Sequence, residues 1–130
     1  AMAPAAFDTI NQHLQDTGRT IDYYDLVLTG DLGAQGLKML RILAEQNKTP
    51  YDERVQDGGV LIYSPSQSVG AGGSGCACSA VLTLGFINTK MYLGEINKAL
   101  VVGTGALLNS LTVLQGESIP CIAHAVAIET

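Results

Sequence analysis

The stretch YDLVLTGDLG, residues 24–33, indicates where the sheet of this protein begins. Leu26, Val27 and Leu28 form a continuous apolar run, which is typical of a short strand buried on both faces of a parallel sheet. The run ends in a loop that carries Asp31. This aspartate has two interpretations: its carboxylate caps the helix that follows, or it binds a ligand.

The segments on either side of this strand predict two helices. Residues 33–48 repeat apolar side chains every three or four positions and place charged ones between them, as an amphipathic helix does. Residues 3–16 follow the same spacing, with Pro4 near the start and Gly18 just past the end. His13 lies off the apolar stripe, so we interpret it as a solvated helix residue rather than a catalytic base.

The rest of the chain predicts three further strands and one helix. A polar segment leads into GVLIY, residues 59–63, which has the composition of a strand. Residues 76–90 predict a helix that is buried on most of its surface. Two apolar runs, residues 97–108 and 121–129, predict adjacent antiparallel strands. The element order implies an α/β fold, a single domain over residues 1–130 with a mixed sheet and helices on its faces.

Composition and charge exclude several classes of function. The chain has 130 residues, of which 47% are hydrophobic, and carries a net charge of -5. Because nucleic-acid binding requires clustered lysines and arginines, a nucleic-acid partner is not expected. No apolar run is long enough to span a bilayer, and no signal peptide is evident, so we expect a soluble protein made in the cytosol. The apolar excess predicts a buried face that requires a partner.

Three cysteines, Cys76, Cys78 and Cys121, do not indicate a disulfide framework or a metal site. A structural zinc needs about four ligands, and these thiols with one histidine reach that number only if the fold happens to gather them. We therefore expect no metal and no cofactor. Cys78 is interpreted as a packing residue, whereas Cys76 is equally consistent with packing and with reactivity as a nucleophile.

The stretch VGAGGSGCACSAVLTLGF, residues 69–86, begins as a glycine-rich loop and continues into the helix predicted over residues 76–90. It lacks the Gly-Lys-Ser/Thr of a phosphate-binding loop, and its G-x-G-x-x-G spacing does not follow directly from a strand. Small residues before a helix can still point backbone N–H groups at an anion. His124 lies in the last apolar run and shares one face with Ile122 and Val126, as a core residue or a base that lines a pocket.

Several segments together resemble the stage V sporulation protein AD family of spore-forming bacteria. They follow in order over nearly the whole chain: AMAPAAFDTI, DYYDLVLTGDLG, AGGSGCACSAV, VVGTGALLNS and QGESIPCIAHAVAIE. The resemblance covers the C-terminal half of that family, which is similar to thiolases and other condensing enzymes. It implies a thiolase-like half-domain with a five-stranded mixed sheet, and a partner half that precedes this chain.

The resemblance also implies a function, which is the binding of dipicolinic acid or calcium dipicolinate for its uptake into the developing spore. Membrane proteins of the same operon would be partners, and the location would be cytoplasmic or peripheral to the spore inner membrane. Asp31 stands where condensing enzymes carry a catalytic histidine, and GGSGCACS stands where they carry an asparagine-containing loop. The catalytic set is thus expected to be lost, and the protein is expected not to be an enzyme.

The predicted ligand-binding residues are Asp31, Gly73, Ser74, Gly75, Cys76 and His124. In this hypothesis the backbone N–H groups from Gly73 to Cys76 receive the ligand carboxylates. Two alternatives remain open: an acyl-transfer condensing enzyme that uses Cys76, and a structural half that docks to membrane proteins. The isolated half is expected to self-associate through its exposed interface.

Overall fold

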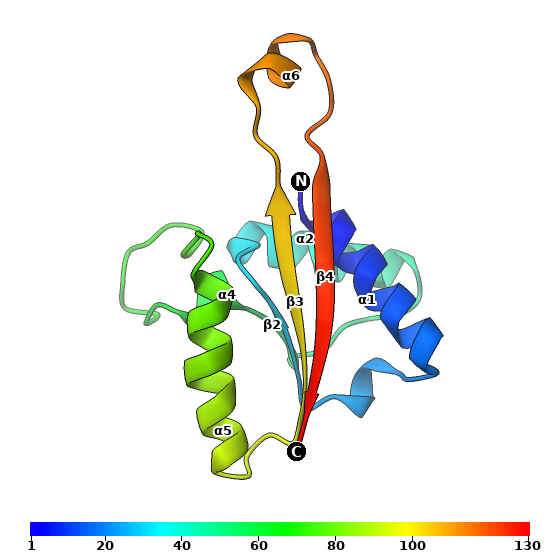
Figure 1. The fold of residues 1–130 in the computed structure, drawn as a ribbon, viewed down its shortest axis with the longest axis vertical. Helices are drawn as coiled ribbons and strands as arrows, with labels where there is room; N and C mark the ends of the chain where they lie inside the picture. The colour runs from blue at the N-terminus through cyan, green and yellow to red at the C-terminus, as the bar shows by residue number, and fades with distance from the viewer.

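The computed structural model describes residues 1–130 and contains a mixed four-stranded sheet with helices on both faces (Figure 1). Strand β1 (Leu26–Thr29) is parallel to β2 (Val55–Asp57) and to β3 (Lys98–Ala106), whereas β4 (Cys121–Glu129) is antiparallel to β3, which gives the order β2-β1-β3-β4. The mixed α/β class, the buried first strand and the antiparallel final pair are confirmed. The resemblance implied five strands, and the sheet has four.

The strand predicted at residues 59–63 is wrong. Its first three residues belong to a short helix, α3 (Gly58–Leu61), and the strand β2 lies just before that helix. The Asp57 carboxylate accepts a hydrogen bond from the backbone N–H of Val60, so it caps α3 and turns the chain out of the sheet. A local capping contact therefore overrides the strand preference of the residues in GVLIY.

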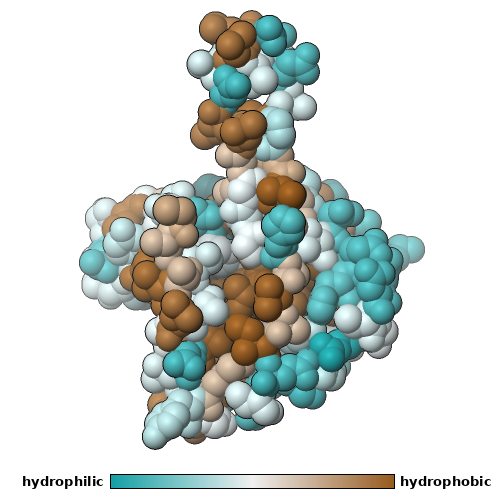
Figure 2. All heavy atoms as spheres, in the orientation of Figure 1, coloured by the Kyte–Doolittle hydropathy of each residue, from teal (hydrophilic) through white to brown (hydrophobic).

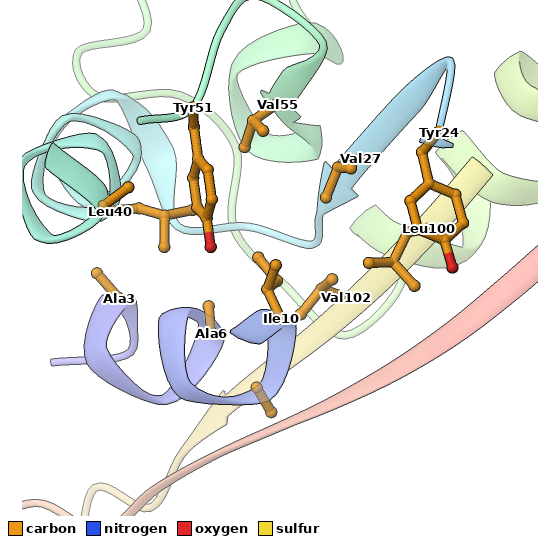
Figure 3. Close-up of a cluster of buried hydrophobic side chains, with 12 residues drawn as sticks. Ala3, Ala6, Ile10, Tyr24, Val27, Leu40, Tyr51, Val55, Leu100 and Val102 are labelled. Carbon is orange, nitrogen blue, oxygen red and sulfur yellow. The ribbon is translucent and has the colours of Figure 1, made fainter. Parts of the chain in front are cut away.

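One face of the sheet is covered by α1 (Ala3–Thr17) and α2 (Gly33–Gln46), with the single turn η1 (Ile21–Tyr23) before β1. Apolar side chains of both helices meet those that β1, β2 and β3 direct to this face (Figure 3). This core consists of Ala3, Ala6, Ile10, Tyr24, Val27, Leu40, Ala44, Tyr51, Val55, Leu100, Val102 and Ala123. Both predicted helices are confirmed.

The opposite face is covered by three consecutive helical segments, α4 (Cys78–Val81), the π-helical η2 (Leu82–Ile87) and α5 (Asn88–Tyr92). On this face, buried side chains of η2 pack against side chains of β1 and β3 that point away from the first core. This second core consists of Leu26, Leu28, Leu82, Ile87, Ile96 and Ala99. The helical segment predicted from residue 76 begins at Cys78, and it is not buried on most of its surface: Val81 is 54% and Leu84 75% exposed.

The edge strand β4 is covered on one face only. Ala123 is buried against α1, and the Thr9 hydroxyl on α1 donates a hydrogen bond to the Ala123 carbonyl at 3.1 Å. Ile122 and Val126 point to the other face and are exposed, and His124 shares that alternation. In Figure 2, hydrophobic atoms gather in the middle of the visible face. The sheet thus presents an uncovered apolar face beside α4 and η2.

His13 is not a solvated side chain as expected. It is half-buried, and its Nε2 lies within hydrogen-bond distance of the hydroxyl of the buried Tyr24. Arg19 donates to that same hydroxyl at 3.0 Å, which leaves the tyrosine proton for the neutral histidine ring. Burial lowers the pKa of His13, and the positive charge of Arg19 lowers it further by a smaller amount. His13 therefore stabilises the junction between α1 and β1.

The connection between β3 and β4 forms an arm, residues 107–120, which projects beyond the sheet and carries the short helix α6 (Ser110–Leu114) (Figure 1). The ladder continues from the pair Ala106 and Cys121 to a hydrogen bond between the Leu107 N–H and the Pro120 carbonyl. No helix in the structure has both the length and the apolar character that crossing a membrane requires.

Candidate functional site

A cavity of about 510 Å³ lies at the carboxyl ends of β1 and β3, and we call it the carboxyl-end pocket. In sheets with parallel strands this is the edge at which ligands usually bind. The walls come from four separate segments of the chain. They are Gly30 and Asp31 after β1, Gly75, Cys76 and Ser79 before and within α4, Gly103 to Ala106 on β3, and Ile122 and His124 on β4.

Asp31 holds the glycine-rich loop at the mouth of this pocket. Its Oδ2 accepts hydrogen bonds from the Ser74 hydroxyl at 3.0 Å and from the Gly75 N–H at 3.1 Å. Its Oδ1 has only a long contact, 3.4 Å, with the Thr104 hydroxyl. The Asp31 Oδ2 therefore binds the loop, and the Oδ1 can still accept a hydrogen bond from a ligand or coordinate a cation.

Asp31 does not cap the following helix. The cap residue of α2 is Leu32, and the N–H groups of Leu32 and Gly33 donate to the Asp57 carboxylate at 2.8 and 2.9 Å. Asp57 is 1% exposed and also accepts from the Thr29 hydroxyl at 2.7 Å. The structure thus corrects the capping interpretation of Asp31, because a carboxylate at the end of the neighbouring strand occupies that position.

Asp57 is the residue that sequence reasoning missed. It accepts four hydrogen bonds from three segments, the end of β1, the start of α2 and the start of α3. The aspartate immediately before Gly58 and Gly59 is a capping signal for a helix, but the composition of the residues that follow favours a strand. Asp57 fixes the loop that carries Asp31 and so acts as a positioning residue for the pocket.

The predicted anion cradle is only partly free. The Gly73 N–H donates to the Gly59 carbonyl at 2.6 Å, and the Gly75 N–H donates to Asp31. Two of the four N–H groups proposed to receive ligand carboxylates are therefore engaged within the chain. Gly73 and Ser74 line a neighbouring cavity of about 200 Å³, and Gly75 borders both cavities. Asp31, Gly75, Cys76 and His124 come together in the carboxyl-end pocket.

The two cysteines near the pocket differ in environment. Cys76 is exposed at the pocket wall, whereas Cys78 is buried against the sheet. Burial raises the pKa of the Cys78 thiol, and the charges of Asp31 and Asp57 raise it further. Cys78 is thus a packing residue, as interpreted, and a thiolate is disfavoured there. All three cysteines are free, and no three His, Cys, Asp or Glu side chains gather as a metal site.

A larger cavity, about 560 Å³, lies at the other end of the parallel strands. It is formed by the end of α1, the segment before β1 and the loop between α2 and β2. Its cation, Arg19, is already paired with Glu129 at 2.9 Å and with Tyr24. We therefore place the candidate site at the carboxyl-end pocket, where the Asp31 Oδ1 has only the long contact with Thr104 and can accept from a ligand.

Comparison with known proteins gives a consistent result. A sequence model described as Stage V sporulation protein AD matches residues 1–129. Stage V sporulation protein AD of Bacillus subtilis (strain 168) is 50% identical to the chain over 129 residues. The aligned part covers 99% of this chain and 38% of that relative, so the chain spans less than two fifths of the relative's length. The chain belongs to the stage V sporulation protein AD family.

Proposed function

We propose that this chain forms part of a dipicolinate-binding protein that acts in spore formation, and that the ligand occupies the carboxyl-end pocket. The observation that carries the proposal is the convergence of Asp31, Gly75, Cys76 and His124 from three separate segments on one cavity. Membership of a stage V sporulation family supports the role in the spore. On this proposal the scaffold binds and delivers its ligand without catalysing a reaction.

The shape of the pocket suits a small planar molecule. Its volume of about 510 Å³ lies within the usual range for small-molecule sites. Gly103 and Gly105 on β3 contribute backbone without side chains to one wall, and a Cβ placed at Gly103 would meet nothing within 4 Å. An aromatic ring can therefore approach the strand closely at this position.

The charge of the pocket favours the calcium chelate over free dipicolinate. The lining includes the Asp31 carboxylate and no lysine or arginine, so a free dianion would meet a like charge. Calcium takes six to eight oxygen ligands, and dipicolinate supplies only some of them. The Asp31 Oδ1, which has only the long contact with Thr104, is placed to complete the coordination of a chelated ion. The cation would thus arrive with its chelator.

The proposal is tested by calorimetry on the full-length protein, titrated with dipicolinate in excess calcium and, separately, in a calcium chelator. We expect the calcium chelate to bind about tenfold or more tightly than free dipicolinate, because the carboxylate then meets a cation. Asp31→Asn should abolish this calcium-dependent gain. Asp22→Asn, which alters an exposed carboxylate on η1, is the control and should bind as the unaltered protein does.

Absence of heat with both forms of dipicolinate, together with binding of an acyl thioester, would contradict the proposal. Equal affinity for the two forms would contradict the role of Asp31 but would leave dipicolinate binding intact. The two results separate the ligand from the way in which it is bound.

A second candidate function is acyl transfer, favoured by the presence of Cys76 and His124 in one cavity. A thiolate nucleophile at Cys76 should react with iodoacetamide at neutral pH, whereas Cys78 should stay unmodified because it is buried and its pKa is raised. Peptide mass spectrometry after timed alkylation distinguishes the sites. An unreactive Cys76 would exclude the enzymatic alternative, and modification of Cys78 first would contradict the packing described above.

The remaining chain of the full-length protein is the proposed partner of the uncovered sheet face. The relative continues well beyond the part that this chain matches, and the exposed Leu84, Ile122 and Val126 lie on the side where α4 and η2 leave β4 bare. Because the carboxyl-end pocket opens toward the same side through Ile122 and His124, the missing part would also complete the binding site. Association with membrane proteins of the same operon belongs to this proposal.

A further inference from the structure

Tyr24 carries a buried hydroxyl whose two hydrogen-bond partners are His13 on α1 and Arg19 just after it. The tyrosine is 0% exposed, and because residues 1–130 bury it completely, a further part of the full-length protein cannot reach it without displacing them. Arg19 can only donate, so the tyrosine proton has a single acceptor, the Nε2 atom of His13. The contact therefore requires a neutral His13 with its ring proton on Nδ1.

A protonated His13 does not fit this arrangement. Both ring nitrogens of the cation are donors, so Nε2 would direct an N–H group at the oxygen that already accepts from Arg19. The tyrosine proton would then be buried without an acceptor, and two positive charges would meet at one oxygen. Burial and the charge of Arg19 lower the pKa of His13, as this geometry requires, whereas the charge of Asp16 raises it by a smaller amount.

Arg19 also holds the end of β4. Its Nη1 atom lies 2.9 Å from the Glu129 carboxylate, and the Tyr23 hydroxyl on η1 donates to the same carboxylate at 3.2 Å. The cations nearby offer no acceptor, since Arg54 donates to the Tyr24 carbonyl and the Lys98 ammonium lies 3.9 Å from the centre of the Tyr23 ring. The charged groups around the two tyrosines are Asp16, Arg19, Arg54, Lys98 and Glu129.

We propose that protonation of His13 releases the junction between the end of α1, η1 and the end of β4, so that His13, Tyr24, Arg19 and Glu129 form a pH-sensitive switch. A charged His13 repels Arg19 and competes with it for the Tyr24 hydroxyl, which weakens the link from Arg19 to Glu129. The switch lies at the amino ends of the parallel strands, at the edge opposite the carboxyl-end pocket. It does not depend on the ligand proposed for that pocket.

Denaturant unfolding of the full-length protein between about pH 7.5 and about pH 5.5 tests the switch. Because the pKa of His13 is lower in the folded chain, the unfolded chain takes up the proton first, and the free energy of unfolding falls as the pH drops below about 7. His13→Gln keeps an uncharged acceptor for the Tyr24 hydroxyl, so its unfolding midpoint should fall less. Asp8→Gln, at an exposed position of α1, is the matched control and should retain the full fall.

Hydrogen exchange followed by mass spectrometry locates the release. After correction for the intrinsic exchange rate at each pH, the unaltered full-length protein should lose protection in residues 11–25 and 121–130 on acidification. Residues 33–46, which form α2, should keep theirs. In His13→Gln all three segments should keep their protection, because the switch has no group that takes up the proton.

Carbon-13 NMR of the histidine-labelled full-length protein reports the protonation state directly. The signal that is missing in His13→Gln belongs to His13, and at neutral pH its Cδ2 shift should be that of a ring with the proton on Nδ1. Tyr24→Phe removes the shared oxygen, so His13 should take up its proton at a higher pH. Equal falls of the unfolding midpoint in the unaltered protein and His13→Gln, a cationic His13 at neutral pH, unchanged protection near Glu129, or an unchanged titration in Tyr24→Phe would each overturn the proposal.

Discussion

Asp57→Ala is expected to lower the free energy of unfolding by about 3 kcal/mol or more. Hydrogen bonds to a charged group each contribute about 1.5–3 kcal/mol, and buried donors left without a partner add a desolvation cost. The carboxylate is 1% exposed and receives four donors, two of them the N–H groups of Leu32 and Gly33. Removal of the side chain leaves these donors without their acceptor beside the end of β1.

Denaturant unfolding followed by circular dichroism measures this effect. Asp57→Asn should also destabilise the protein, because the amide nitrogen cannot accept from Gly33 and Val60 as the second carboxylate oxygen does. Asp8→Ala is the control, since Asp8 is an exposed residue on α1, and its change should stay within about 0.5 kcal/mol. If Asp57→Ala unfolded with the midpoint of this control, the role assigned to Asp57 would be wrong.

Gly59→Ala should be nearly as damaging, for a steric reason. A Cβ at Gly59 would lie 2.3 Å from the carbonyl oxygen of Gly73 and 3.1 Å from the Asp57 carboxylate. Backbone on both sides must then move, at a cost of about 2 kcal/mol or more. Because Gly73 belongs to the loop held by Asp31, the displacement should also weaken ligand binding at the carboxyl-end pocket.

Gly85→Ala provides the contrasting case. Gly85 is exposed in η2, and a Cβ there would meet nothing within 4 Å. Alanine in a helix is favoured over glycine by about 0.5–1 kcal/mol, so this variant should unfold at the same or a higher denaturant concentration. Equal stability of the two alanine variants would show that the close approach of Gly59 to the glycine-rich loop does not matter.

The elements with strong periodicity were predictable from the sequence. The apolar run from Leu26 to Leu28 specified a buried strand, and the three-to-four spacing in residues 3–16 and 33–48 specified the helices on one face. The alternation around His124 placed Ile122 and Val126 together on the exposed face of β4. In each case the periodic pattern specified which side chains share a face, and no distant residue competed with it.

The two incorrect assignments have different causes. GVLIY has the composition of a strand, but the Asp57 carboxylate accepts from the nearby Val60 N–H and starts a helix there, a local contact that composition alone does not reveal. The capping of α2 could not be assigned correctly, because the acceptor lies 25 residues from Leu32. Local preferences do not reveal which of two aspartates reaches a given N–H group.

The predicted site shows the same division. Asp31, Gly75, Cys76 and His124 do meet, since strand ends and the loops that follow them gather at one edge of a sheet. The predicted set of free N–H groups is only partly present, because the Gly73 N–H donates to the Gly59 carbonyl and the Gly75 N–H donates to Asp31. Thr104 and the backbone of Gly103 line the pocket only because β3 pairs with β1, and no local pattern predicts that pairing.

The contact between Thr9 and Ala123 has a consequence for solubility. An edge strand with few charges, such as β4, offers a ready template for an incoming strand and so for aggregation. Because α1 packs against β4 and the Thr9 hydroxyl occupies the Ala123 carbonyl, one acceptor needed by such a strand is already taken. The first helix therefore disfavours the pairing of β4 with a strand of another molecule.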